Sequence, residues 1–261
     1  MTAGLHAAAP IGIFDSGVGG LSVLRALQAQ LPHERFLYYA DTAHCPYGER
    51  DVATIRARAE AISAELISAG AKLIVVACNT ATIAAIAHLR ARFELPFVGM
   101  EPGVKPAVMA SRSGHVGVLA TTRSLAGERF QALVDAHARG VTVHTRACSG
   151  WVERVEAGDL HSPACMAMLR GDVQPLIEAR CDVLVLGCTH FPFLAPALRD
   201  LVGPDIHLLD TGPAVARQAA RVLGDAAALN PASGPGPTLW RCSGSDQDFQ
   251  QQRRLLGFAA T

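Results

Sequence analysis

Two cysteines in this chain could act together as a proton donor and a proton acceptor. Cys78 and Cys188 each close a run of Val, Leu and Ile, and each is followed at once by small hydroxyl or amide side chains. A run that is apolar at successive positions suits a strand covered on both faces, as in a parallel sheet. Each cysteine then falls at the carboxyl end of its strand, where open α/β sheets bind ligands. Two thiols that approach one carbon from opposite sides could remove a proton from one face and deliver a proton to the other.

Neighbouring residues could adjust both thiols. A free thiol has a pKa of about 8.5, and the amino end of a helix or a cationic neighbour lowers it. Cys78 precedes an expected helix start at Asn79, and His190 could share or relay the proton of Cys188. Asp15 follows another strand and could bias a proton at Cys78, or it could cap the next helix. Each cysteine alone is more typical of a buried structural residue, but the matching positions favour function.

Other motifs in the chain are less specific. Residues 15–20 open a helix after a strand, but they form neither a GxGxxG nor a Walker sequence. In residues 41–48 a Pro-Tyr-Gly turn could present backbone N–H groups to a carboxylate, although without context it is simply a turn. No group of His, Cys and Asp residues has the spacing of a metal site, so we expect no bound metal.

The chain reads as one α/β arrangement built twice. Strand, helix and strand alternate, which predicts parallel sheets with right-handed crossovers. We expect a first α/β domain from residues 1–100 plus 211–261 and a second from 101–210. In the tail, 238–242 is expected to add an edge strand and 247–256 a terminal helix. The segments that match in order are residues 11–16 with 116–121, 36–41 with 141–146, 71–80 with 181–190, and 97–102 with 206–211.

Composition excludes several classes of protein. The 261 residues carry 23 basic and 23 acidic side chains without a long block of one sign, so we expect neither nucleic acid nor a membrane as partner. No apolar stretch is long enough to span a membrane, and the start lacks the pattern of a signal peptide. Seven cysteines without a CxxC motif suit a cytoplasmic protein with free thiols. Only Lys72 and Lys105 could form a Schiff base with pyridoxal phosphate.

Taken together, the motifs closely resemble the cofactor-independent aspartate/glutamate racemase family, over nearly the whole chain. The two cysteine motifs are specific to that family. The matching segments are Asp-Ser-Gly-Val-Gly-Gly-Leu-Ser-Val at 15–23, Asp41 with Cys-Pro-Tyr-Gly at 45–48, Ala-Cys-Asn-Thr-Ala-Thr at 77–82, Gly-Cys-Thr-His-Phe-Pro at 187–192 and Leu-Asp-Thr-Gly at 209–212.

The resemblance implies a site and a reaction. Cys188 would take the α-proton from L-glutamate with the help of His190, and Cys78 would take it from D-glutamate with the help of Asp15. Asp41 and Glu156 are further candidates for the site. The substrate's carboxylates and amine would be held by Ser16, Tyr47, Gly48, Asn79, Thr80, Thr121 and Thr189.

The family also implies a setting. Its two parallel-sheet domains are pseudo-symmetric and face each other across a central cleft, and its members use no cofactor. We therefore expect glutamate as the small-molecule partner, a homodimer, and a role in supplying D-glutamate for peptidoglycan in the bacterial cytoplasm.

Two segments depart from the family's pattern. The Thr-rich loop of the family reads Ala-Thr-Thr-Arg-Ser at 120–124, and its Cys-Pro-x-x-Val-Pro segment reads Cys-Ser-Gly-Trp-Val-Glu-Arg at 148–154. Two alternatives remain at this point. The first is a racemase of the same fold for aspartate or another amino acid, and the second is a non-catalytic, two-lobed amino-acid-binding protein.

Overall fold

The computed structural model of the protein describes residues 5–258. Within it the chain forms two compact units. Unit 1 combines the chain up to Met100 with the chain from Gly212 onward, and unit 2 runs from Glu101 to Thr211. No helix among residues 5–258 is both long enough and apolar enough to cross a membrane.

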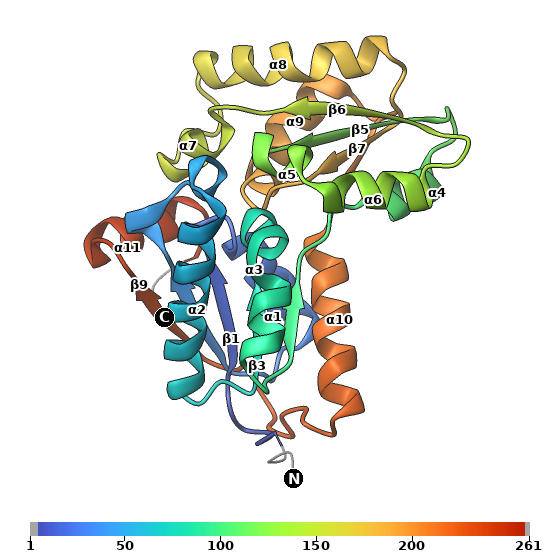
Figure 1. Ribbon diagram of the computed structural model, residues 1–261. Coiled ribbons are helices and arrows are strands. Elements are labelled where there is room, and N and C mark those ends of the chain that lie inside the picture. Colours follow the sequence, from blue (N-terminus) through green and yellow to red (C-terminus); the bar gives the residue numbers. More distant parts are fainter. Residues whose placement is uncertain (1–4, 259–261) are drawn as a thin grey trace. The chain divides into compact units, whose positions relative to one another are not determined.

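Unit 1 is built on a five-stranded parallel sheet in the order β4-β3-β1-β2-β9 (Figure 1). Its last strand comes from the tail of the chain and pairs with β2, so that Phe36 lies opposite Thr238. The strands are β1 (Ile11–Asp15), β2 (Phe36–Ala40), β3 (Leu73–Val76), β4 (Phe97–Gly99) and β9 (Thr238–Cys242).

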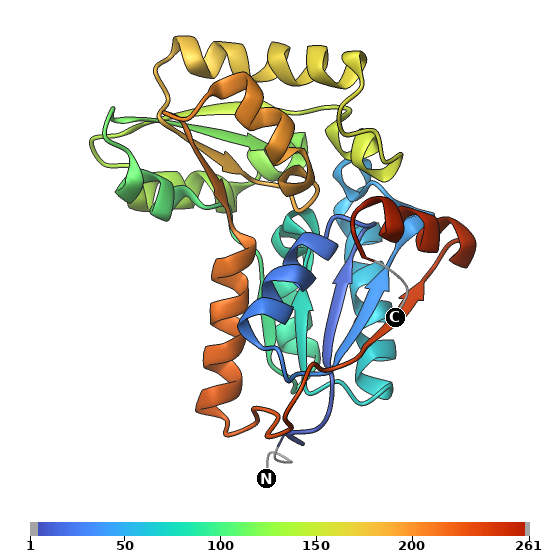
Figure 2. The same ribbon diagram turned by 180° about the vertical axis from the view of Figure 1, so that it is seen from behind.

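Helices cover both faces of this sheet. Figure 1 shows α2 and α3 on one face, and the view from behind in Figure 2 shows α1 and α10 on the other. Two short 3-10 helices follow β2. The helical elements of unit 1 are α1 (Leu21–Gln30), η1 (Thr42–His44), η2 (Tyr47–Glu49), α2 (Val52–Ser68), α3 (Asn79–Arg92), α10 (Gly212–Asp225) and α11 (Asp246–Leu255).

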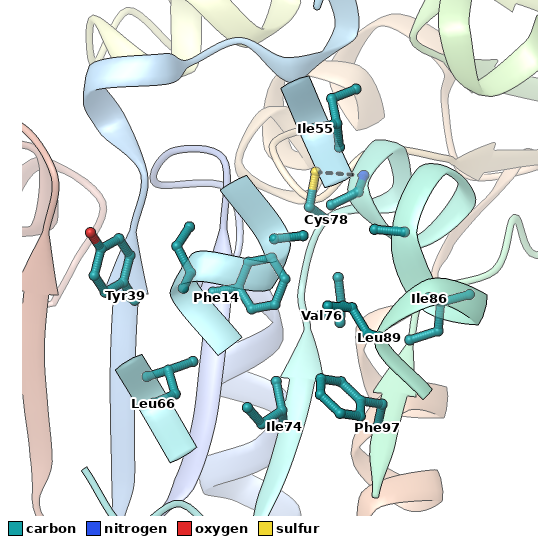
Figure 3. Packing of buried hydrophobic residues seen from close by; sticks show 14 of the residues in the cluster. Phe14, Tyr39, Ile55, Leu66, Ile74, Val76, Cys78, Ile86, Leu89 and Phe97 are labelled. Atoms are coloured by element: carbon teal, nitrogen blue, oxygen red, sulfur yellow. Dashed lines mark hydrogen bonds between the residues drawn. The ribbon is translucent and has the colours of Figure 1, made fainter. Parts of the chain in front are cut away.

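The apolar sequence of the central strands explains this layering. Every residue of β1, β2 and β3 is buried, as expected for strands covered on both faces. On the side of α2 and α3, Phe14, Val76 and Phe97 pack against Leu66 and Leu89 (Figure 3). Cys78 belongs to this core as well, so the packing between sheet and helices holds the thiol between the end of β3 and the start of α3.

Unit 2 holds a four-stranded parallel sheet in the order β6-β5-β7-β8. Helices α8 and α9 cover one face, and α4 and α6 cover the other (Figure 1). Its strands are β5 (His115–Ala120), β6 (Thr142–Ala147), β7 (Val183–Leu186) and β8 (His207–Asp210). Its helical elements are α4 (Val104–Ala110), α5 (Thr122–Ala126), α6 (Glu128–His137), α7 (Trp151–Glu156), α8 (Pro163–Glu178), η3 (Phe191–Leu194) and α9 (Ala195–Val202).

The two sheets repeat one topology. The first four strands of unit 1 and the four strands of unit 2 follow the same spatial order, with β1 matching β5 and β3 matching β7. The prediction of two parallel-sheet α/β domains is confirmed. Both cysteine-bearing strands occupy the equivalent inner position of their sheets, next to the first strand of each unit.

Candidate active site

In unit 1 the site begins where β3 passes into α3. Cys78 is the N-terminal cap of α3, and its sulfur accepts a hydrogen bond from the backbone N–H of Ala81 at 3.4 Å (Figure 3). An N–H group at the amino end of a helix stabilises negative charge on the atom that it faces. The thiol is buried and lies 3.7 Å from the Ser16 hydroxyl, to which it donates. The position therefore favours a sulfur that exchanges protons.

Asp15 ends the neighbouring strand β1 and is fully buried. Its Oδ2 accepts hydrogen bonds from the N–H groups of Gly17, at 3.3 Å, and Gly20, at 2.9 Å. A Cβ on Gly20 would lie 2.7 Å from the Cβ of Asp15, so only glycine lets the turn close around this carboxylate. The turn after β1 thus holds Asp15 at the carboxyl end of the sheet.

The loop after β2 is organised by Asp41. This buried carboxylate accepts hydrogen bonds from the Tyr47 hydroxyl and from Nε and an η-nitrogen of Arg58, the latter two at 3.0 and 2.7 Å. Nδ1 of His44 lies 3.0 Å from Oδ1 of Asp41, the oxygen that also accepts from the Arg58 η-nitrogen. Tyr47 is itself buried, and Gly48 follows it in η2. Both oxygens of Asp41 are therefore engaged by contacts that hold Tyr47 and the loop in place.

The charges of this loop follow from these contacts. Burial alone would raise the pKa of Asp41, but hydrogen bonds from Arg58 and Tyr47 outweigh burial and hold the pKa below its ordinary value. Burial, and then the Asp41 carboxylate, raise the pKa of Tyr47 far above its ordinary value. Tyr47 thus remains a protonated hydrogen-bond donor at neutral pH.

Asn79 and Thr80 form the first turn of α3 and are both buried. The side-chain amide of Asn79 is unusual, because neither its oxygen nor its nitrogen has a hydrogen-bond partner among the described residues. A buried amide without partners is unfavourable in the absence of a ligand. Asn79 directly follows Cys78, so this unpartnered amide lies at the same end of the sheet as the thiol.

In unit 2 the corresponding thiol belongs to Cys188, which follows β7. Its sulfur lies 3.6 Å from Nδ1 of His190, and Nε2 of His190 lies 2.6 Å from a carboxylate oxygen of Glu156. Cys188, Thr189 and His190 are all buried. A thiol, an imidazole and a carboxylate in series can act as an acid–base relay, in which the carboxylate orients the ring and supports its positive form.

Two buried residues fix the helix that carries Glu156. Trp151, at the start of α7, donates from Nε1 to Oδ2 of Asp172 on α8 at 2.8 Å. Its ring also packs on Phe191, with ring centroids 4.7 Å apart. The other oxygen of Asp172 accepts from Nε of Arg146 at 2.8 Å. Residues 148–154 lack the prolines of the family's pattern, and the hydrogen bond between the Trp151 indole and the Asp172 carboxylate holds this segment in place instead.

Thr121 has a local structural task. Its hydroxyl oxygen accepts from the N–H of Ser124 at 3.3 Å as the cap of α5, and its hydroxyl donates to the Ser124 hydroxyl at 2.9 Å. Ser124 is buried, whereas Thr121 is partly exposed. Thr121 thus presents its side chain at the carboxyl end of β5, next to β7 in the sheet.

Two of the three other buried thiols have surroundings that differ from those of Cys78 and Cys188. Burial, Asp172 and Cys188 raise the pKa of Cys148 far above its ordinary value. Burial, with Asp182 beside it, raises the pKa of Cys181 to about 11. Both remain protonated at neutral pH. Within either unit, the described residues contain no group of three His, Cys, Asp or Glu side chains close enough to share a metal ion.

The predicted residues thus gather in two groups, one at the carboxyl end of each sheet. Asp15, Ser16, Asn79 and Thr80 accompany Cys78, while Thr189, His190 and Glu156 accompany Cys188. The sequence analysis did not single out Arg58, Trp151 or Asp172. Each acts through a contact with a residue distant in the sequence, which no local motif reveals.

The fold and these groups define a class: two-unit parallel α/β proteins with a cysteine at the carboxyl end of equivalent strands. Known proteins place the chain within that class. A family model described as Asp/Glu/Hydantoin racemase matches residues 12–219. The chain belongs to this family.

Individual proteins are similar over almost their whole length. A glutamate racemase of Herpetosiphon aurantiacus is 51% identical over 247 residues, which cover 95% of this chain and 97% of that protein. The structure of a glutamate racemase from Bacillus anthracis has a TM-score of 0.88 at 28% identity and covers 98% of this chain and 97% of its own. Escherichia coli glutamate racemase, solved with L-glutamate and the activator UDP-MurNAc-ala, has a TM-score of 0.84 at 30% identity, covering 96% of both chains.

Proposed function

We propose that this protein is a glutamate racemase, which interconverts L- and D-glutamate by proton transfer between two thiols and the substrate's α-carbon. The observation that carries the proposal is the pair of equivalent cysteines, each at the end of a buried strand and each in contact with a proton-exchanging or charge-stabilising partner. The curated relatives with about half of their residues identical are named glutamate racemases.

In the proposed reaction, Cys188 acts as the base toward L-glutamate. The Cα–H bond breaks, the proton passes to the Cys188 thiolate, and the Cys78 thiol delivers its proton to the opposite face of the carbon. Cys78 is then left as a thiolate, which the Ala81 N–H stabilises. The reverse reaction begins at Cys78 with D-glutamate. Proton exchange with solvent restores the starting state.

The other groups supply orientation and charge stabilisation. The α-proton is weakly acidic, so negative charge that develops on the α-carboxylate needs donors around it. Asn79, with its unpartnered amide, is the best supported donor. Ser16, Thr80 and Thr189 are proposed to add hydroxyl donors, and Tyr47 and Gly48 to add backbone N–H groups. Thr121, whose hydroxyl proton goes to Ser124, is proposed to accept from the substrate's amine. Asp15 supports proton exchange at Cys78, and the His190–Glu156 pair supports it at Cys188.

No cofactor is required in this scheme, because the thiols exchange the proton and the surrounding donors stabilise the charge. Neither of the two lysines is placed to form a Schiff base with a cofactor beside Cys78. Lys72 is buried in an ion pair with Glu34 at the start of β3, whereas Cys78 follows the other end of this strand. Lys105 is exposed.

By resemblance, we further propose a cytoplasmic homodimer that supplies D-glutamate for peptidoglycan. Analytical ultracentrifugation tests the dimer.

The reaction is tested by incubating the protein with L-glutamate in D₂O without pyridoxal phosphate. We expect optical rotation to disappear while deuterium enters the α-position. Cys78→Ala and Cys188→Ala should abolish both signals. Cys181→Ala is the matched control, because this buried cysteine lies at the opposite end of the same strand β7 and should leave turnover unchanged.

Other outcomes have definite meanings. Normal turnover in either active-site variant would overturn the two-thiol mechanism. Racemisation of L-aspartate but not of L-glutamate would change the substrate. Binding of an amino acid without exchange of its α-proton would identify a binding protein instead.

A further inference from the structure

A buried tryptophan and a buried carboxylate lie behind the Cys188 relay without belonging to it. Trp151 is completely buried, and its indole N–H donates to Asp172 at 2.8 Å. The second oxygen of Asp172 is taken by Arg146. Since both oxygens of this carboxylate are engaged, its orientation is fixed, and the hydrogen bond to the indole fixes the start of α7 in turn.

Helix α7 is thereby held at both ends. At its first residue, Trp151 binds Asp172 and packs on Phe191, the residue that directly follows His190. At its last residue, Glu156 meets Nε2 of His190 at 2.6 Å. A directional hydrogen bond sets the rotation of the helix about its axis, which apolar packing alone sets less sharply. The angle at which Glu156 meets His190 therefore depends on the Trp151–Asp172 contact.

We propose that Trp151 and Asp172 are positioning residues for proton transfer at Cys188, because they hold α7 so that Glu156 keeps His190 aligned with the thiol. This inference rests on the proposed function and deepens it. A supporting shell that loosens by about 1 Å can cost up to about 100-fold in rate. We therefore expect Trp151→Phe and Asp172→Asn to lower kcat/KM for glutamate about 10- to 100-fold.

Isotope effects separate positioning from general loss of structure. The two enantiomers have equal free energy, so kcat/KM must fall equally in both directions and cannot show which thiol is affected. A slower step at Cys188 instead makes that step more rate-limiting. The primary deuterium isotope effect on kcat/KM should rise for L-[2-²H]glutamate, whose proton Cys188 removes. It should fall for D-[2-²H]glutamate, whose proton Cys78 removes.

Matched variants complete the experiment. Trp151→Phe retains a ring against Phe191 and deletes the indole donor, together with part of the buried ring system. Asp172→Asn leaves the indole in place, so it separates the hydrogen bond from this loss of volume and provides a second test should the first variant not fold. Glu156→Gln should reproduce the same pair of isotope shifts. Trp240→Phe is the control, since this second tryptophan lies on β9 of unit 1 and its Nε1 has no hydrogen-bond partner among residues 5–258. It should leave both isotope effects at wild-type values.

The outcomes are distinguishable. Opposite shifts of the two isotope effects in Trp151→Phe or Asp172→Asn, and none in Trp240→Phe, would support the inference. Reduced turnover with unchanged isotope effects, or unchanged turnover, would overturn it while leaving the proposed function intact. Absence of glutamate racemisation in the wild-type protein would overturn the proposed function, and with it this inference.

Discussion

Asn79 and Thr82 lie on the same helix, but their polar side-chain atoms differ in how many hydrogen bonds they make within the protein. The amide of Asn79 is buried without a partner among the residues that the structure describes. The Thr82 hydroxyl donates to the Val76 carbonyl at 3.2 Å and accepts from the Met100 N–H at 3.0 Å. An unpartnered buried amide destabilises the folded protein, whereas the Thr82 hydroxyl joins α3 to β3 and to the residue that follows β4.

Replacing Asn79 by alanine should separate stability from activity. The variant loses an unsatisfied buried amide and gains helix propensity, so we expect the free energy of unfolding to rise by about 1 kcal/mol. The KM for glutamate should rise at the same time. Urea unfolding and initial rates measure the two effects. Thr82→Ala is the control, and its free energy of unfolding should fall. We expect a decrease of about 1–3 kcal/mol, because the Met100 N–H is left without a hydrogen-bond acceptor. A less stable Asn79→Ala protein would contradict this account.

The pKa of Asp41 predicts how stability changes in acid. Because the pKa in the folded state lies below its ordinary value of 3.8, the ionised carboxylate stabilises the protein above that pH. This contribution is lost as the pH falls through the pKa of the folded state. Asp41→Asn should be less stable by about 1–3 kcal/mol at neutral pH, and the difference from wild type should shrink below about pH 4.

Urea unfolding at a series of pH values measures this difference. The exposed Asp200 supplies a control for the loss of one carboxylate, since Asp200→Asn should change stability at neutral pH by less than about 0.5 kcal/mol. If the Asp41→Asn deficit stayed constant down to the acid transition, the stabilisation would not come from the charge of Asp41.

At the scale of single elements, the position of the Cys188 thiol depends on the glycine directly before it. Gly187 comes between β7 and Cys188, and its N–H donates to the Leu119 carbonyl at 2.7 Å. A Cβ at this position would lie 2.7 Å from that carbonyl oxygen and 3.0 Å from the Cβ of Ala120. The end of β7 can approach β5 this closely only without a side chain.

Gly187→Ala should therefore displace the chain directly before Cys188. We expect a destabilisation of about 1–3 kcal/mol and a lower kcat, since the thiol moves with the backbone. Thermal unfolding and initial rates test both. Gly171→Ala is a contrasting control, because that glycine is exposed within α8 and a Cβ there meets nothing within 4 Å. It should stabilise the protein by about 0.5–1 kcal/mol. Wild-type kinetics in Gly187→Ala would show that the close approach is dispensable.

The elements also show what the sequence can and cannot reveal. Continuous apolar runs predict buried parallel strands, and the cysteines at their ends are local features, so the position of both thiols could be predicted. Helix α10 was not predicted, although Val215, Ala219 and Leu223 lie on one helical face. The Asp172–Trp151 and Asp41–Arg58 contacts join residues of separate elements. Their pairing depends on how the elements pack, which no local pattern contains.

At the scale of the whole molecule, one lysine ties distant parts of unit 1 together. Lys72 is buried, and its Nζ lies 2.6 Å from Glu34. It also donates to the carbonyls of Ala7, at 2.5 Å, and Ala228, at 2.8 Å. The second oxygen of Glu34 accepts from the N–H of Asn230. This cluster fastens the beginning of the chain and the segment after α10 to the start of β3.

Lys72→Met should destabilise the protein strongly, because it leaves the Glu34 carboxylate buried without its countercharge. A loss of about 3–5 kcal/mol is typical when one partner of a buried ion pair is removed. Urea unfolding measures it, with the exposed Lys105→Met as the control that should change stability by less than about 0.5 kcal/mol. Equal stability of the two variants would refute a structural role for the Lys72 cluster.

The position of β9 has a consequence for synthesis on the ribosome. Unit 2 is one uninterrupted stretch of chain. The sheet of unit 1, in contrast, is complete only when Thr238–Cys242 has been synthesised and pairs with β2 as strand β9. Domains fold as units while the chain is being made, and pairing between distant segments is slow. We expect the inserted unit to complete its sheet on the nascent chain while β2 still presents an open edge. Any truncation before Thr238 leaves that edge available to other chains, and such edges promote aggregation.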